Sequence, residues 1–289
     1  MSVRKALQTL MLTAACLAAV LVATPAQADT TDIAPPGANN WSCKPSAEHP
    51  YPVVLVPGTF ESMAKNWATM SPYLAGQGYC VFSLNYGTTN GVPATGPIAD
   101  SAGELANFVG AVLGATHARQ VDLVGHSQGG MMPRYYIKNL GGTKTVHALI
   151  GIAPSNHGTQ GLIVPDSTGT QEALSTSGTP DGGSPCQACI DQQAGSDFLT
   201  ALNAGGDVQG KVFYTVISTV HDEVVTPYTS QALAGSASQV TNLVIQNLCP
   251  LDPIEHDQTP NDPVVQQLVL AALNQNSGPA DPAYRPACT

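Results

Sequence analysis

A serine with a glycine two residues away on each side lies near the middle of the chain, within the stretch Val121–Gly130. Gly125, Ser127 and Gly129 form the pattern Gly-x-Ser-x-Gly. In this pattern the serine occupies a strained turn between a strand and a helix, where glycine avoids the collision that a Cβ atom would make. The hydroxyl is then exposed at the carboxyl edge of a sheet. We therefore predict that Ser127 is a nucleophile, which requires a base, an acid and an oxyanion hole elsewhere in the chain.

The base must be a neutral histidine, because a serine hydroxyl is a poor nucleophile at neutral pH. On this kind of turn the partners follow the serine in the order acid, then histidine. That order leaves His157, His221 and His256 as candidates. We predict His256, which lies in a turn-rich loop after the last strand. His157 stays an alternative, and His221 directly precedes the best acid.

The acid should lie at the end of the strand that follows the long central loop. The strand Val212–Ser218 runs into Asp222, which is our first choice, and Glu223 could serve instead. A carboxylate at this place would hold the histidine in the tautomer that can accept the serine proton.

The oxyanion hole needs backbone N–H donors aimed at the developing negative charge. One donor normally belongs to the residue after the nucleophile, here Gln128, and the other to the loop after the first central strand. That loop contains Gly58 and Thr59, and Thr59 can offer its amide and its hydroxyl. We therefore predict Thr59 and Gln128 as the oxyanion residues.

Metal and redox sites need separate consideration, because acidic residues and cysteines cluster in two loops. The carboxylates around His256 could bind calcium or could form a solvated acidic loop; they are Asp252, Glu255, Asp257 and Asp262. Cys186 and Cys189 have the C-x-x-C spacing of redox and zinc sites, but we place them in a Gly/Pro/Ser-rich loop without a second close pair. We expect neither a cofactor nor a metal.

Strand and helix signals alternate from Tyr51 onward, which predicts an α/β fold with a mainly parallel central sheet and helices on both faces. The expected strands are Val53–Val56, Tyr79–Leu84, Gln120–Val124, Val146–Ala153, Val212–Ser218 and Val240–Ile245. The expected helices are Met63–Gly76, Ile98–Thr116, Met131–Leu140 and Pro263–Asn274. Pro133 lies inside the third helix and should kink or shorten it.

The segment of residues 159–209 has no strong strand signal and is rich in Gly, Ser and Thr, with one helix expected near Gly195–Asn203. A connection of this length in one domain usually serves a function. We expect a lid or substrate-binding insertion; a surface insertion without fixed structure is the alternative.

The N-terminus reads as a secretory signal peptide of residues 1–28, with a basic start, an apolar run and a cleavage site after Ala28. Cys16 could instead mark a lipoprotein anchor. The remaining residues 29–289 suit a single domain without a membrane-spanning segment. The whole chain has a net charge of −10, and loss of Arg4 and Lys5 makes the mature chain still more acidic. This charge argues against nucleic acid and anionic membranes as partners.

Six cysteines remain after cleavage, and an even number in an exported chain indicates disulfides. Spacing alone leaves 15 possible connectivities for six cysteines. The cysteines are Cys43, Cys80, Cys186, Cys189, Cys249 and Cys288.

The motifs together resemble those of secreted bacterial triacylglycerol lipases, in particular the class 2 lipases of actinomycetes, and also fungal lipase B. The motifs are Val-Leu-Val-Pro-Gly-Thr-Phe60, Val-Gly-His-Ser-Gln-Gly-Gly-Met-Met-Pro-Arg-Tyr-Tyr136, Ala-Pro-Ser-Asn-His-Gly-Thr159, the Asp222 loop and the Cys249–His256 loop. The resemblance implies an α/β-hydrolase fold, with Ser127, Asp222 and His256 as the triad and Thr59 with Gln128 as the oxyanion hole. It also implies the disulfides Cys43–Cys80 and Cys249–Cys288, which leaves Cys186 and Cys189 as the third pair.

The expected function is therefore that of a secreted serine hydrolase that cleaves lipid esters through an acyl-enzyme, acting as a monomer on a lipid or other ester substrate. Two alternatives keep the same triad: an extracellular acyltransferase and a polyester depolymerase. A non-catalytic binding protein of the cell envelope is a further alternative, against which the complete set of catalytic residues argues.

Overall fold

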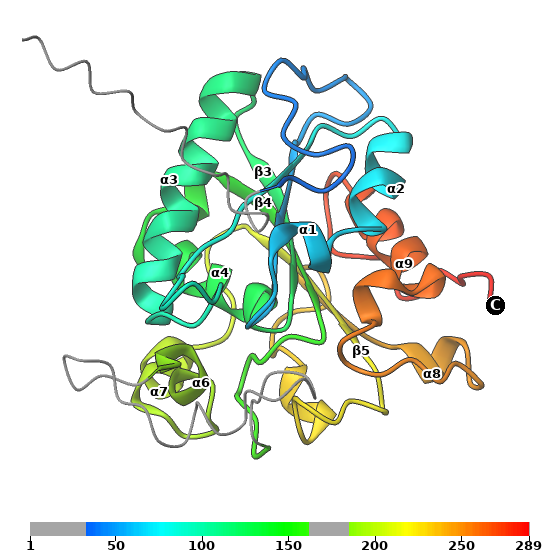
Figure 1. Cartoon of the computed structure of the whole chain (residues 1–289). Coiled ribbons are helices and arrows are strands. Elements are labelled where there is room, and N and C mark those ends of the chain that lie inside the picture. The colour runs from blue at the N-terminus through cyan, green and yellow to red at the C-terminus, as the bar shows by residue number, and fades with distance from the viewer. Residues whose placement is uncertain (1–32, 162–184, 289) are drawn as a thin grey trace, which may run out of the picture.

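The computed structural model describes residues 33–161 and 185–288 (Figure 1). The expected signal peptide, its cleavage site and Cys16 lie outside the described residues, as does most of the first half of the expected insertion 159–209. Among the described residues, no helix is long and apolar enough to cross a membrane.

Six parallel strands form one central sheet, in the order β2-β1-β3-β4-β5-β6. Their bounds are β1 Val53–Val56, β2 Val81–Ser83, β3 Val121–His126, β4 Val146–Ile152, β5 Phe213–Ser218 and β6 Val240–Val244. Short runs of apolar, β-branched residues buried on both faces are typical of such strands. The expected parallel α/β sheet is thus confirmed, and all six strands end at one edge, which we call the carboxyl edge.

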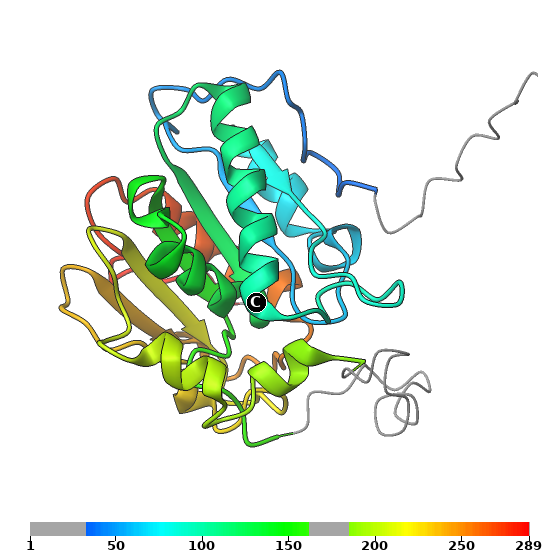
Figure 2. The same cartoon turned by 90° about the vertical axis from the view of Figure 1, so that its left-hand side faces the viewer.

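Helices cover both faces of the sheet, and the alternation of side chains along β1 shows how. Val54 and Val56 point to the face covered by α3 (Ile98–Thr116) and α4 (Gln128–Asn139). Val53 and Leu55 point to the opposite face, covered by α2 (Met70–Gly76) and α9 (Pro263–Leu273). Figure 2 shows α3 lying along the face turned to the viewer. Each face of the sheet thus has its own hydrophobic core. The side chains in it come from every second residue of a strand and from helix residues spaced by about 3.6 positions.

The remaining helices are short and lie in the connections. They are α1 Met63–Asn66, α6 Gln187–Asp191, α7 Asp197–Asn203, α8 Ile245–Leu248 and the 3₁₀ turns η2 Gly142–Lys144, η3 Tyr228–Gln231 and η4 Thr259–Asn261. In Figure 1, α6 and α7 lie together below α3 and α4, close to the carboxyl edge. The described half of the expected insertion therefore folds into two helices.

Two helices differ from the sequence prediction. The expected helix Met63–Gly76 is broken into α1 and α2 at Trp67, which leaves helical geometry and is fully buried in the second core. The helix α4 runs through Pro133 and continues to Asn139, so the proline does not shorten it as expected. The intrinsic helix propensity of a residue has little influence on where a helix ends when tertiary packing fixes the path of the chain.

Three disulfides use the six cysteines: Cys43–Cys80, Cys186–Cys189 and Cys249–Cys288. These are the pairs that the resemblance implies. The sequence argument placed Cys186 and Cys189 in a loop, whereas in the structure Cys186 is the N-cap of the short helix α6 and Cys189 lies within this helix. The sulfur of Cys186 accepts a hydrogen bond from the amide of Cys189 and so caps the first turn of α6. The sequence pattern does not predict this turn.

Candidate active site

The Gly-x-Ser-x-Gly motif forms a sharp turn between β3 and α4. Ser127 has φ 53° and ψ −122°, a conformation rarely adopted by a residue with a side chain. A Cβ atom on Gly125 would lie 1.8 Å from the carbonyl oxygen of Gly129, and one on Gly129 would lie 2.1 Å from that of Val56. Only glycine fits at these two positions, so the close packing of strand and helix holds the serine in its strained geometry.

An acid–base pair lies on the two loops that follow β5 and β6. His256 Nδ1 and Asp222 Oδ2 are 2.8 Å apart, and both residues are buried. The carboxylate accepts further hydrogen bonds from the amides of Val224 and Val225, at 3.0 and 2.7 Å, and from Gln231 Nε2 at 2.7 Å. These donors fix the carboxylate, and the carboxylate in turn holds the proton of His256 on Nδ1.

The electrostatic environment of His256 favours its protonated form. Burial lowers the pKa of His256, but the hydrogen bond and charge of Asp222 outweigh burial, with smaller contributions from the charges of Asp257 and Glu223. The net result is a pKa above the usual 6.5. Stabilisation of the imidazolium by a buried carboxylate is what a base needs when it takes a proton during a reaction.

A second histidine joins this pair to the serine turn. His126 directly precedes Ser127, its ring centroid lies 4.9 Å from that of His256, and its Nε2 lies 3.1 Å from the backbone oxygen of His256. Asn66 Oδ1 accepts from the amide of Gly58 at 2.8 Å, so its Nδ2 donates to His126 Nδ1 at 3.1 Å. The proton of His126 is therefore on Nε2, where it donates to the His256 loop.

The ring of His126 stays neutral in this network. Burial, followed by the charge of His256, lowers the pKa of His126 well below 6.5. Its hydrogen bonds pack the loop of His256 against the turn that carries Ser127 and, through Asn66, against Gly58. The structure thus brings all three predicted triad residues to one end of the sheet.

The two predicted oxyanion residues are in direct contact. Thr59 Oγ1 donates a hydrogen bond to Gln128 Oε1 at 2.8 Å. Gln128 is the first residue of α4, where backbone N–H groups have no partner within the helix and favour negative charge. Tyr86 fixes the preceding part of the loop by donating its hydroxyl to the carbonyl oxygen of Pro57 at 2.6 Å.

The family model of the lipases of class 2 matches residues 50–269, which contain every residue of the candidate active site described above. The chain belongs to the class 2 lipase family. The matched range includes the sheet, the serine turn and the loops of Asp222 and His256, so the family covers the complete candidate site.

Solved structures of lipases share the fold of this lipase-family chain. Aspergillus fumigatus lipase B has a TM-score of 0.68 at 22% identity, over 86% of this chain and 57% of that one. The mature form of Bacillus licheniformis lipase BlEst2 gives 0.50 at 16% identity, over 69% and 85% of the two chains. A structure from the metagenome-derived lipolytic enzymes LipS and LipT gives 0.54 at 15% identity, over 83% and 99%. This chain thus spans less than two thirds of the Aspergillus protein.

The alternative catalytic residues lie in other environments. The ring nitrogens of His157 lie 3.1 Å from Asp207 Oδ1 and 2.9 Å from the backbone oxygen of Ser230, so both have partners other than the Asp222 carboxylate. His221 and Glu223 are exposed. In this lipase-family chain the geometry therefore favours His256 over His157 and Asp222 over Glu223.

The acidic residues around His256 act as caps and turn formers. Asp262 caps α9 by accepting from the amide of Val265 at 2.9 Å, and Asp252 accepts from that of Ile254 at 3.0 Å. Glu255 accepts from the amide of Asp257 at 2.8 Å. Within residues 33–161 and 185–288, no group of three or more His, Cys, Asp or Glu side chains could hold a metal ion.

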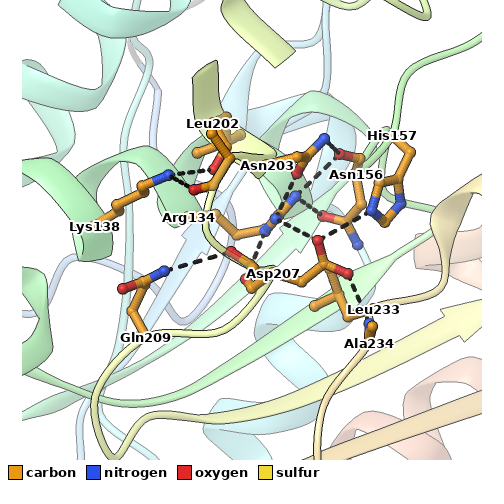
Figure 3. Close-up of polar contacts among 12 residues, drawn as sticks. Arg134, Lys138, Asn156, His157, Leu202, Asn203, Asp207, Gln209, Leu233 and Ala234 are labelled. Atoms are coloured by element: carbon orange, nitrogen blue, oxygen red, sulfur yellow. Dashed lines mark hydrogen bonds and ion pairs between the residues drawn. The ribbon is translucent and has the colours of Figure 1, made fainter. Parts of the chain in front are cut away.

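A buried polar cluster connects α4 to the chain after α7 (Figure 3). Arg134 Nη1 donates to the backbone oxygen of Asn156 at 3.0 Å, and its Nη2 donates to Asn203 Oδ1 at 2.7 Å and reaches Asp207 Oδ1 at 3.4 Å. Burial lowers the pKa of Arg134 to about 10, which keeps the group cationic at neutral pH. The same Asp207 oxygen contacts His157.

A lysine one turn further along α4 completes this attachment. Lys138 Nζ donates to the backbone oxygens of Leu202 and Ala204 at 2.8 and 2.6 Å, at the C-terminal end of α7. A cation at this end also interacts favourably with the helix dipole. The helix that starts at the predicted nucleophile thus holds α7 against the sheet.

Four residues of the site were not predicted from the sequence: Asn66, His126, Gln192 and Gln231. His126 lies inside the serine motif, so its position was a signal that could have been used. The other three are placed by hydrogen bonds over 9, 60 and 133 positions, which join Gln231 to Asp222, Asn66 to His126 and Gln192 to Thr59. No sequence spacing marks such contacts.

Proposed function

We propose that this chain is a carboxylic-ester hydrolase that acts on lipid esters through an acyl-enzyme. The observation that carries the proposal is the hydrogen bond between His256 and the buried Asp222, on loops packed against the strained turn of Ser127. An activated serine at the carboxyl edge of a parallel sheet is suited to acyl transfer.

The reaction follows from the roles of these groups. His256 Nε2 removes the proton of Ser127 as the serine oxygen attacks the ester carbonyl carbon, and the backbone amides of Thr59 and Gln128 stabilise the resulting oxyanion. His256 then gives the proton to the leaving alcohol, and the acyl group stays on the serine. Water attacks the acyl-enzyme with His256 as base again, which releases the carboxylic acid and restores the serine.

Exposed apolar side chains near the carboxyl edge support a lipid substrate. Val92, Ile190 and Val220 are 40, 50 and 40% exposed, and Leu251, five residues before His256, is 96% exposed. Each lies in α6 or in a loop that follows a strand of the sheet. Apolar residues at the rim of the site would favour the contact of acyl chains with the protein.

We further propose that residues 29–289 form one secreted, monomeric domain after cleavage behind Ala28, with residues 159–209 as the substrate-binding insertion. The three disulfides support an oxidising compartment. The acyltransferase and polyester depolymerase keep the same triad as alternatives; an alcohol acceptor or a solid polyester in the assay would reveal them by the products formed.

The test combines covalent labelling with hydrolysis of esters of increasing acyl length. A fluorophosphonate should label the wild-type protein and fail to label Ser127→Ala, while Ser83→Ala, which alters a buried serine of β2, should keep the label. Hydrolysis should be measured below and above the solubility of each ester. If the folded wild-type protein is neither labelled nor active, the proposal is wrong.

A further inference from the structure

A buried glutamine from the expected substrate-binding insertion, residues 159–209, contacts both predicted oxyanion residues. Gln192 is the C-cap of α6 and is 0% exposed. Its Nε2 lies 2.9 Å from Thr59 Oγ1 and 3.4 Å from Gln128 Oε1. We propose that Gln192 is a positioning residue that sets the direction of the Thr59 hydroxyl proton, an inference that rests on the proposed ester hydrolysis.

The amide of Gln192 is itself held in one orientation. Its Oε1 accepts from the hydroxyl of Ser155 at 2.8 Å, and its Nε2 donates to the backbone oxygen of Ala188 at 3.0 Å as well as to Thr59. A flipped amide would turn its NH₂ to the Ser155 hydroxyl and its oxygen to the Ala188 carbonyl, which cannot donate. The contacts therefore assign which atom is oxygen and which is nitrogen.

This orientation decides what the Thr59 hydroxyl can do. Because Gln192 donates to Thr59 Oγ1, the hydroxyl proton must point elsewhere, and in the resting protein it points to Gln128 Oε1 at 2.8 Å. The order of donation thus runs from Ser155 to Gln192, and from Gln192 through Thr59 to Gln128. Without Gln192, the hydroxyl would be free to turn its lone pairs toward the developing negative charge.

The same arrangement allows the proton to move when charge develops. The Thr59 hydroxyl can rotate from Gln128 Oε1 to the oxyanion while Gln192 continues to donate to its oxygen. The two protons of Gln192 Nε2 are directed at Thr59 Oγ1 and at the Ala188 oxygen. Because Gln128 Oε1 lies 3.4 Å from the same nitrogen, it can share the proton that is directed at Thr59, in a bifurcated hydrogen bond. A donor that is present and correctly directed only when the oxyanion forms raises kcat and leaves KM nearly unchanged.

The experiment measures kcat and KM for a soluble ester in a double-mutant cycle. Gln192→Met removes the donor at similar volume, and Thr59→Val removes the hydroxyl on which it acts. Gln193→Met is the matched control, because the side-chain amide of the neighbouring Gln193 has, among the described residues, only two long hydrogen bonds, to the carbonyl oxygens of Gly161 and Cys189 at 3.4 Å. Thermal unfolding of each variant checks that it is folded.

We expect Thr59→Val to lower kcat about 100-fold and Gln192→Met about tenfold, within or below the range for one oxyanion donor, with KM changed less than about twofold. In the Thr59→Val background, Gln192→Met should lower kcat less than about twofold. Gln193→Met should have no effect. Such non-additivity shows that Gln192 acts through Thr59.

Two results would overturn the inference. One is an equal loss of kcat in both backgrounds, which would give Gln192 a structural role alone; the other is a rise in KM without a change in kcat. If Gln192→Met does not fold, Gln192→Glu replaces it, and the same comparison between the two backgrounds decides. An inactive, unlabelled wild-type protein would instead refute the proposed function, so the two failures are distinguishable.

Discussion

Replacement of Asp222 by asparagine is the sharpest test of the proposed acid. The two carboxylate oxygens have separate partners: Oδ1 accepts from the amides of Val224 and Val225, and Oδ2 accepts from Gln231 and His256. In Asp222→Asn the side-chain oxygen should stay with the two fixed backbone donors. The new NH₂ group would then face His256 Nδ1.

The consequence is the wrong tautomer of the base. His256 would accept at Nδ1 and carry its proton on Nε2, where it could no longer take the proton of Ser127. Such a change lowers kcat about 10⁴-fold in serine hydrolases, which corresponds to about 5 kcal/mol of transition-state stabilisation. Folding should be retained, because Gln231 Oε1 has no hydrogen-bond partner among the described residues and can turn to accept from the new NH₂.

The assay is the rate of hydrolysis of a soluble ester, normalised by titration of the reactive serine. Glu223→Gln is the matched control, since Glu223 is exposed and one residue away; its rate should stay within about twofold of the wild type, as for most surface changes. Near-normal activity of Asp222→Asn together with an inactive Glu223→Gln would show that the acid is Glu223.

The remaining predictions concern pH, stability and thiols. The rate of ester hydrolysis by the wild-type enzyme should rise with pH, with a midpoint above 6.5, because the raised pKa of His256 keeps this base protonated and inactive at lower pH. A midpoint below pH 6 would contradict this. Arg134→Met should lower the free energy of unfolding in urea by about 3 kcal/mol, because it leaves Asp207 and buried carbonyls without their cation; a loss below about 1 kcal/mol would contradict it. His157→Gln should lower the free energy of unfolding below pH 6.5, where His157 is charged in the folded and in the unfolded state, and this loss should shrink as pH rises through the folded-state pKa. That pKa is raised mainly by the hydrogen bond to Asp207; a loss that does not change with pH would refute the ion pair. Thiol titration of the unfolded mature chain without reductant should find no free cysteine, and two or more would contradict three disulfides.

Elements with a strong apolar pattern could be predicted closely. The helix Ile98–Thr116 and the strand Val53–Val56 have the predicted bounds. The buried residues of the helix repeat with the helical period, and the strand is a short run in which every residue is apolar and buried. The prediction of one helix Met63–Gly76 was wrong, because Met63, Trp67, Met70 and Leu74 keep a helical spacing although the backbone leaves helical geometry at Trp67. Packing against the sheet decided where this chain turns.

The candidate site could be predicted where function depends on chain order and not where it depends on distant contacts. Ser127, Asp222 and His256 follow from a local motif and from the order of residues after successive strands. Asn66 and Gln192 do not, because their hydrogen bonds join residues 60 and 133 positions apart. Such contacts exist only after the sheet has assembled.

The attachment of α7 to α4 has a consequence for protein engineering. Arg134 and Lys138 belong to α4, the helix that follows the predicted nucleophile, and most of their partners are backbone and side-chain oxygens of residues 201–207. A chimaera that exchanged residues 185–209 for the segment of a relative would leave a buried guanidinium without its carboxylate, which is strongly destabilising. A successful graft must bring an acid at the place of Asp207, or an apolar residue must replace Arg134 at the same time.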